Sequence, residues 1–253
     1  MAVYAPITLG RGARTVVCLP GWYGSADGWG PWRTYLDTEE FRWVFFDYRG
    51  YGIRMGETGS FTLDEIAKDV LAVIDRLPAG PVHLVGHSMG GSVMQKVLAE
   101  APEGRIGRLV GVAPTPGTGT DLDDDARRLF ESAAENPEAR RAIIDLTSGH
   151  RLPSAWLDRM VEKSLLRSIP EAFAAYLRAW ADTDLSEQVR GRTNPLLALY
   201  GEHDPAVTEQ SLRDSYGELF PHAEIRRIGN AGHYPMFETP LALVADVEEF
   251  LAR

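Results

Sequence analysis

The stretch that most constrains the fold is residues 81–100, PVHLVGHSMGGSVMQKVLAE, where an apolar run, a Gly-His-Ser-Met-Gly turn and a helical pattern follow one another directly. The apolar run predicts a buried strand, and the spacing of the apolar residues after the turn predicts a helix. Gly86 and Gly90 give a sharp strand-to-helix turn the room it needs, because a side chain there would collide with neighbouring backbone. Ser88 is therefore held at the tip of the turn, where the first N–H groups of the helix favour negative charge.

Short apolar runs alternate with helical patterns along most of the chain, which is typical of a mostly parallel, doubly wound sheet with helices on both faces. The predicted strands lie at 15–19, 43–47, 82–86, 109–113, 196–200 and 224–228, with one edge strand near 3–9. The clearest predicted helices lie at 62–77, 89–100 and 241–252. The first of them opens on a capping box formed by Thr62 and Glu65. The predicted fold class is α/β.

The alternation of strands stops between Pro114 and Arg192, where the pattern becomes helical with breaks at prolines. We interpret this stretch as a helical lid, residues 117–191, inserted after the sixth strand of a single domain. The core is then formed by residues 1–116 and 192–253. Aromatic residues of the lid pack it onto the core, and some of them are candidates to line a substrate pocket.

The composition is that of an ordinary soluble protein of 253 residues, with 25% charged residues and a net charge of −10. Negative charge of this size disfavours nucleic acids and anionic membrane surfaces as partners. The chain shows no apolar run of about 18 residues and no signal-peptide pattern at its start. The lone Cys18 cannot form an intrachain disulfide, so we expect a cytoplasmic protein. We expect it to be a monomer or a homodimer. The acidic run 121–125 lacks the ligand spacing of a calcium loop, and no metal site is predicted.

Ser88 needs a partner, because a serine hydroxyl is a poor nucleophile until a base takes its proton. His233 is the candidate base and lies in a Gly-rich loop, GNAGHYPMFETP, ahead of the last helix. Asp204, just past a predicted strand, is the candidate acid, since a carboxylate that accepts Nδ1–H would fix the tautomer of the imidazole. Glu202 and Asp121 are weaker candidates for the acid.

The order Ser88, Asp204, His233, each at the carboxyl end of a predicted strand or in the loop after it, resembles the α/β-hydrolase superfamily. The resemblance covers nearly the whole chain. CLPGWYGSADGW at 18–29 matches the oxyanion loop of that family, and FFDYRGYG at 45–52 matches its Asp-x-Arg-Gly-x-Gly turn. The match implies that the backbone N–H groups of Trp22 and Met89 form an oxyanion hole, and it implies no cofactor.

The resemblance implies a serine hydrolase that cleaves a small ester through an acyl-enzyme on Ser88. Its partner is then a small-molecule acyl substrate. The predicted substrate contacts are Trp22, Tyr23, Met89, Trp156, Trp180 and Tyr234.

The chain departs from many members of the family at Pro20-Gly21, where they carry His-Gly. A Pro-Gly pair is found in thioesterases and in some cofactor-free oxygenases of this fold. Thioester hydrolysis, carbon–carbon hydrolysis, perhydrolysis and cofactor-free dioxygenation therefore stay open, as does a ligand-binding sensor that retains the triad. Epoxide hydrolase and dehalogenase chemistry is disfavoured, because those members use an aspartate where this chain has Ser88.

Overall fold

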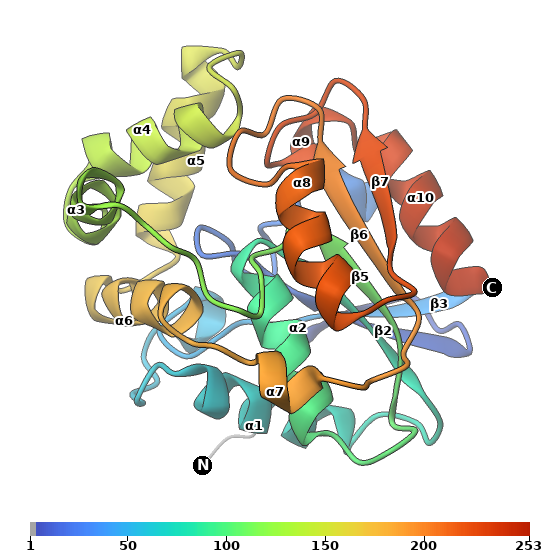
Figure 1. Cartoon of the computed structure of the whole chain (residues 1–253). Helices are drawn as coiled ribbons and strands as arrows, with labels where there is room; N and C mark the ends of the chain where they lie inside the picture. Colours follow the sequence, from blue (N-terminus) through green and yellow to red (C-terminus); the bar gives the residue numbers. More distant parts are fainter. Residues whose placement is uncertain (1–3) are drawn as a thin grey trace.

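A seven-stranded sheet forms the centre of the molecule in the computed structural model, which describes residues 4–253 (Figure 1). The strand order is β1-β3-β2-β4-β5-β6-β7, and only β1 runs antiparallel to its neighbour. The strands are β1 Ile7–Leu9, β2 Arg14–Leu19, β3 Phe41–Phe45, β4 Val82–His87, β5 Ile106–Val112, β6 Leu196–Gly201 and β7 Glu224–Ile228.

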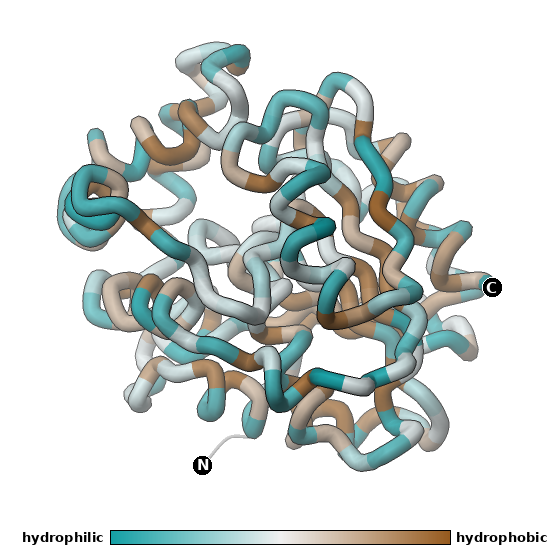
Figure 2. The backbone as a smooth tube through the Cα atoms, viewed as in Figure 1, coloured by the Kyte–Doolittle hydropathy of each residue, from teal (hydrophilic) through white to brown (hydrophobic). Residues whose placement is uncertain are grey.

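Helices cover both faces of the sheet, which explains why its central strands are mostly apolar (Figure 2). Alternate residues of one strand enter different cores: Val17 packs with α1 and α2, whereas Val16 packs with the last helix. The helices of the first face are α1 Leu63–Ile74, α2 Met89–Glu100 and α8 Glu209–Leu212, followed by a π-helical turn at Arg213–Gly217. The second face carries the short 3₁₀ helix Gly30–Thr34 and α10 Pro240–Ala252.

Five helices lie between β5 and β6, and α3 to α6 group together beside the sheet (Figure 1). They are α3 Asp124–Ser132, α4 Pro137–Thr147, α5 Ser154–Leu166, α6 Pro170–Ala181 and α7 Ser186–Val189. We call these five the inserted helices. They follow the fifth strand, so the predicted position after a sixth strand is wrong. The reason is that, within residues 4–253, the short strand β1 is the only one before β2.

The predicted elements are present, with shifted ends. Helix α1 begins after Thr62, whose hydroxyl accepts the N–H of Glu65 at 3.3 Å. The carboxylate of Glu65 binds the N–H groups of Ser60 and Phe61 instead of that of Thr62, so the capping box is only half formed. The edge strand starts at Ile7, and the first predicted residues, up to residue 3, lie outside the described residues.

Two shorter helical pieces complete the fold: the 3₁₀ turn Gly52–Arg54, and α9 Pro235–Glu238 directly after the Gly-rich loop of His233. No helix among residues 4–253 is long and apolar enough to cross a membrane.

Candidate active site

Ser88 occupies a strained turn between β4 and α2, with φ 51° and ψ −120°. Such a conformation is costly for a residue other than glycine, and it persists where the surroundings determine it. A Cβ at Gly86 would overlap the carbonyl oxygen of Gly90, and one at Gly90 would overlap that of Leu19. The two glycines are therefore required by close backbone contacts, as the sequence predicts.

The carbonyl of Ser88 is held by three hydrogen bonds that sequence reasoning did not foresee. It accepts the N–H of Gly91 at 2.7 Å, the N–H of Thr115 at 2.9 Å and the hydroxyl of Thr115 at 3.1 Å. Thr115 belongs to the loop after β5 and is hydrogen-bonded at 2.7 Å to Ser92 of α2. These bonds fix the turn from the neighbouring strand, so the direction of the Ser88 hydroxyl does not rest on the turn alone.

The structure brings His233 and Asp204 to Ser88, from the ends of β7 and β6. His233 Nε2 lies 2.9 Å from Ser88 Oγ, and His233 Nδ1 lies 2.6 Å from Asp204 Oδ2. The side chain of Asp204 has no exposed surface, and its Oδ1 accepts the N–H groups of Ala206 and Val207. A carboxylate so placed requires Nδ1 to donate, which leaves Nε2 free to accept the proton of the Ser88 hydroxyl.

Two further residues fix the backbone of His233. Its N–H donates to the carbonyl of Thr147 at the end of α4, at 3.2 Å, and its carbonyl accepts Nε2–H of His87 at 2.9 Å. Burial, and secondarily the charge on His233, lowers the pKa of His87 to about 3, so His87 stays neutral and serves as a donor. Thr147 escaped prediction because a backbone carbonyl leaves no mark in the side-chain pattern.

The loop after β2, predicted to be the oxyanion loop, is fixed by tyrosine hydroxyls and by an inserted helix. Tyr48 donates to the carbonyl of Pro20 at 2.9 Å and Tyr51 to that of Trp22 at 3.0 Å. The indole N–H of Trp22 donates to the carbonyl of Phe173 in α6 at 2.7 Å. Within residues 4–253 the backbone N–H of Trp22 has no acceptor. Met89 is the first residue of α2, so its N–H lacks an intrahelical acceptor. Both N–H groups are thus available to a ligand.

A mostly apolar cavity of about 280 Å³ opens beside Ser88 and His233. Four of the six predicted substrate contacts line it: Trp22, Tyr23, Trp180 and Tyr234. Its remaining walls come mainly from the loop after β5, from the inserted helices and from the segment after β6, and include Pro114, Thr115, Leu122, Phe130, Ile143, Val207 and Leu212.

Two predicted substrate contacts do not line this cavity. Met89 is fully buried beneath the turn, and Trp156 packs edge-on against Tyr234 and Phe237, at 5.6 and 5.9 Å between ring centroids. The prediction of Trp156 as a wall of the cavity is therefore wrong, because α5 directs this side chain to the far side of Tyr234. Because the Met89 side chain is fully buried, only its backbone N–H remains as a candidate contact for a ligand.

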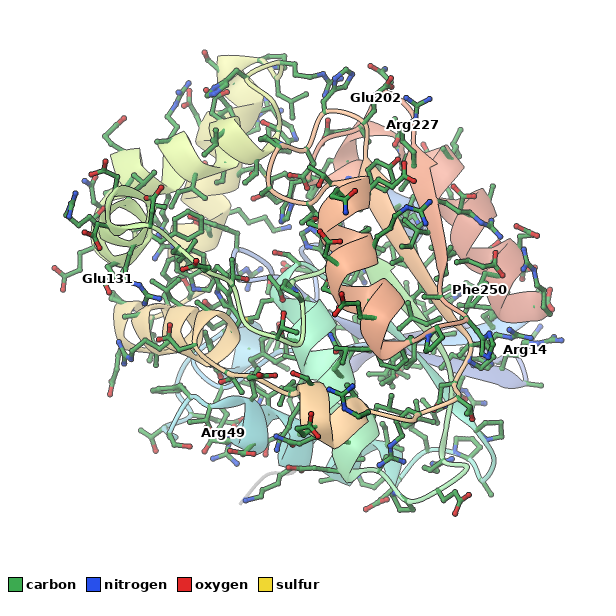
Figure 3. The ribbon with its side chains drawn as sticks, viewed as in Figure 1. Arg14, Arg49, Glu131, Glu202, Arg227 and Phe250 are labelled. Atoms are coloured by element: carbon green, nitrogen blue, oxygen red, sulfur yellow. The ribbon has the colours of Figure 1, made fainter. Side chains whose placement is uncertain are left out.

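The two weaker candidates for the acid do not reach His233. Glu202 binds Arg227 at 3.1 Å and the N–H of Asn230 at 2.8 Å, and Figure 3 shows Glu202 and Arg227 together at the periphery. Asp121 lies in the cavity wall, but it is exposed and forms no hydrogen bond with His233. Asp204 alone among the three carboxylates bonds the imidazole.

The sequence matches the profile of the alpha/beta hydrolase fold over residues 14–240, which is most of the chain. The chain belongs to the α/β-hydrolase family. Among solved structures, this α/β-hydrolase is similar to an esterase from Exiguobacterium antarcticum, with a TM-score of 0.87, 20% identity, and coverage of 98% of this chain and 94% of the other. It is also similar to a bromoperoxidase from Bacillus anthracis, with a TM-score of 0.86, 19% identity and the same coverage.

Relatives in sequence have several names. The α/β-hydrolase is 28% identical to the pimeloyl-[acyl-carrier protein] methyl ester esterase of Photobacterium profundum, over 96% of both chains. It is 25% identical to a non-heme chloroperoxidase of Streptomyces lividans, over 95% of this chain and 92% of the other. It is also 28% identical to the dihydrolipoyllysine-residue acetyltransferase component of the acetoin cleaving system of Pseudomonas putida, but spans only 61% of that longer protein. These likenesses agree with the α/β-hydrolase family that the profile over residues 14–240 shows.

Proposed function

We propose that this α/β-hydrolase cleaves a small carboxylic ester through an acyl-enzyme on Ser88. The observation that carries the proposal is the continuous chain of hydrogen bonds from Ser88 Oγ through His233 to the buried carboxylate of Asp204, beside two free backbone N–H groups. A nucleophile, a base, an orienting acid and an oxyanion site are the four parts that acyl transfer needs.

The reaction proceeds in two halves. Ser88 Oγ attacks the ester carbonyl while its proton passes to His233 Nε2, and the negative oxygen receives the N–H groups of Trp22 and Met89. Asp204 stabilises the imidazolium, whose proton then goes to the departing alcohol. A water molecule repeats the sequence on the acyl-enzyme, which releases the carboxylic acid and restores Ser88.

The test compares Ser88→Ala with Ser132→Ala on a panel of p-nitrophenyl esters. Ser132 lies in α3, where the carbonyl of Leu129 is the only partner of its hydroxyl among residues 4–253, so its loss controls for the change from serine to alanine. We expect the first variant to lower turnover by a factor on the order of 10⁴ or more and the second to leave it unchanged. A fluorophosphonate probe should label the wild type and Ser132→Ala, but not Ser88→Ala. Undiminished turnover by Ser88→Ala would refute the proposal.

The names of the relatives favour one alternative, perhydrolysis, because several are called haloperoxidases. In that reaction hydrogen peroxide replaces water in the second half, so that the acyl-enzyme gives a peracid and free Ser88. Bromination of phenol red by enzyme, acetate, peroxide and bromide measures it. Loss of this activity together with esterase activity in Ser88→Ala is expected if both reactions share the acyl-enzyme.

A further inference from the structure

Two spaces of very different size meet at the reacting groups. The large cavity holds about 280 Å³, and a second compartment on the other side of the site holds about 30 Å³. Five residues line both: Trp22, Tyr23, Ser88, His233 and Tyr234. An ester bound with its carbonyl at Ser88 would therefore extend one substituent into each space.

The small compartment has little room to grow. Its walls include Met160 from α5, Met236 and Phe237 from α9, and Gly24 and Gly28 of the oxyanion loop. Met236 is 2% exposed and Met160 is 9% exposed, so both are packed on their outer sides by other residues. A space of about 30 Å³ accommodates one or two groups the size of a water molecule or a methyl group.

The large cavity is about nine times as spacious and is lined chiefly by apolar side chains such as Val207, Leu212 and Phe130. Each methylene that enters it leaves water and gains binding energy, whereas a methylene forced into the small compartment meets packed side chains. The site therefore favours uneven esters, which have one short and one long substituent, over balanced esters of the same total size with two substituents of equal length.

We infer, on the basis of the proposed function, that the substrate is an ester with one substituent no larger than methyl or ethyl and one apolar substituent of medium length. The short substituent occupies the compartment between α5 and α9, and the long one occupies the cavity beneath the inserted helices. The walls of the small compartment are thus specificity-determining residues.

Three isomeric esters of formula C₉H₁₈O₂ test the inference: methyl octanoate, heptyl acetate and butyl pentanoate. They contain the same atoms, so the total apolar surface is nearly constant and only its division across the ester bond changes. We expect kcat/KM of the faster uneven isomer to exceed that of butyl pentanoate at least tenfold. Which uneven isomer is faster identifies the substituent, acyl or alkoxy, that enters the large cavity.

Met236→Ala should enlarge the small compartment and shrink this ratio severalfold. Met94→Ala is the matched control, because Met94 is equally buried but lies in α2 and lines neither space. Ratios measured on one sample do not depend on the fraction of folded enzyme. Butyl pentanoate cleaved as fast as both uneven isomers, or a ratio unmoved by Met236→Ala, would overturn the inference while leaving the proposed function intact. Failure to cleave any isomer by enzyme that still cleaves p-nitrophenyl esters through Ser88 would overturn this inference alone. Failure to cleave either set of esters faster than Ser88→Ala does would overturn the proposed function and this inference with it.

Discussion

The buried imidazole of His87 should make the stability of this enzyme depend on pH. His87 is 7% exposed, and burial, together with the nearby charge of His233, lowers its pKa from 6.5 to about 3. Between these two values the unfolded chain binds a proton that the folded chain refuses, so the free energy of unfolding falls as the pH falls below about 6.5. Because pH 5 lies about 1.5 pH units below the ordinary pKa of 6.5, the free energy of unfolding at pH 5 is lowered by about 2 kcal/mol.

The perturbation is His87→Gln, which keeps an N–H donor for the carbonyl of His233 but does not titrate. Urea unfolding followed by tryptophan fluorescence at pH 7 and pH 5 gives the free energy of unfolding of each protein. We expect the wild type to lose about 2 kcal/mol more than the variant between these two pH values. The other titrating groups are common to both proteins and cancel in the difference. Replacement of the exposed His222 by Gln controls for the removal of a histidine.

Equal pH slopes for the wild type and His87→Gln would refute this reasoning, because they would mean that His87 takes up its proton in the folded state. The direction of the pKa shift of His87 matters for the proposed catalysis. The rings of His87 and His233 lie 5.2 Å apart between centroids, so a charge on His87 would oppose the imidazolium that the mechanism requires on His233. A neutral His87 avoids that repulsion while it holds the backbone of His233.

Three further predictions concern the turn, the acid and the inserted helices. Gly86→Ala should lower the free energy of unfolding by roughly 2–3 kcal/mol in urea titrations, because the added Cβ overlaps a backbone carbonyl. Gly56→Ala, whose added Cβ meets open space, should change it by less than about 0.5 kcal/mol. Asp204→Asn should reduce kcat on p-nitrophenyl esters by roughly 10³–10⁴-fold with little change in KM, since the amide favours the wrong tautomer of the imidazole; an unchanged kcat would exclude its role. Arg140→Ala should lower the free energy of unfolding by about 3 kcal/mol or more, because this fully buried guanidinium donates to two backbone carbonyls and two serine hydroxyls. Arg141→Ala removes a partly exposed ion pair from the same helix and should lower it by less than about 1 kcal/mol. Similar losses of stability in the two variants would contradict this reasoning.

The sheet and the meeting of Ser88, His233 and Asp204 were predictable because their signals are local. The strand before Ser88, the two glycines and the apolar face of α2 stand within twenty residues of one another. Asp204 follows the apolar run of β6, and His233 follows β7, whose sequence EIRRI is short and more polar. Parallel strands bring their carboxyl ends to one edge of the sheet. Chain order and a single topological rule therefore suffice to bring three distant side chains together.

The walls of the cavity were not predictable in the same way. Trp156 and Trp180 lie on neighbouring inserted helices with similar apolar surroundings, yet only Trp180 lines the large cavity. Their difference arises from the packing of α5 and α6 against the core, which is set by many long-range contacts and by no local pattern. The position of Thr147 behind His233 has the same origin.

The inserted helices do more than cover the cavity, because they form hydrogen bonds with both Trp22 and His233. Trp22 carries one N–H group of the proposed oxyanion site in its backbone. Its indole stacks on Phe173 at 4.0 Å between ring centroids and donates to the carbonyl of that residue. On the other side, the end of α4 holds the N–H of His233. Movement of α4 or α6 would therefore displace Trp22, the proposed oxyanion donor, or His233, the proposed base, as well as the walls of the cavity. In the proposed mechanism, selection of the substrate and assembly of the reacting groups are thus coupled through the inserted helices.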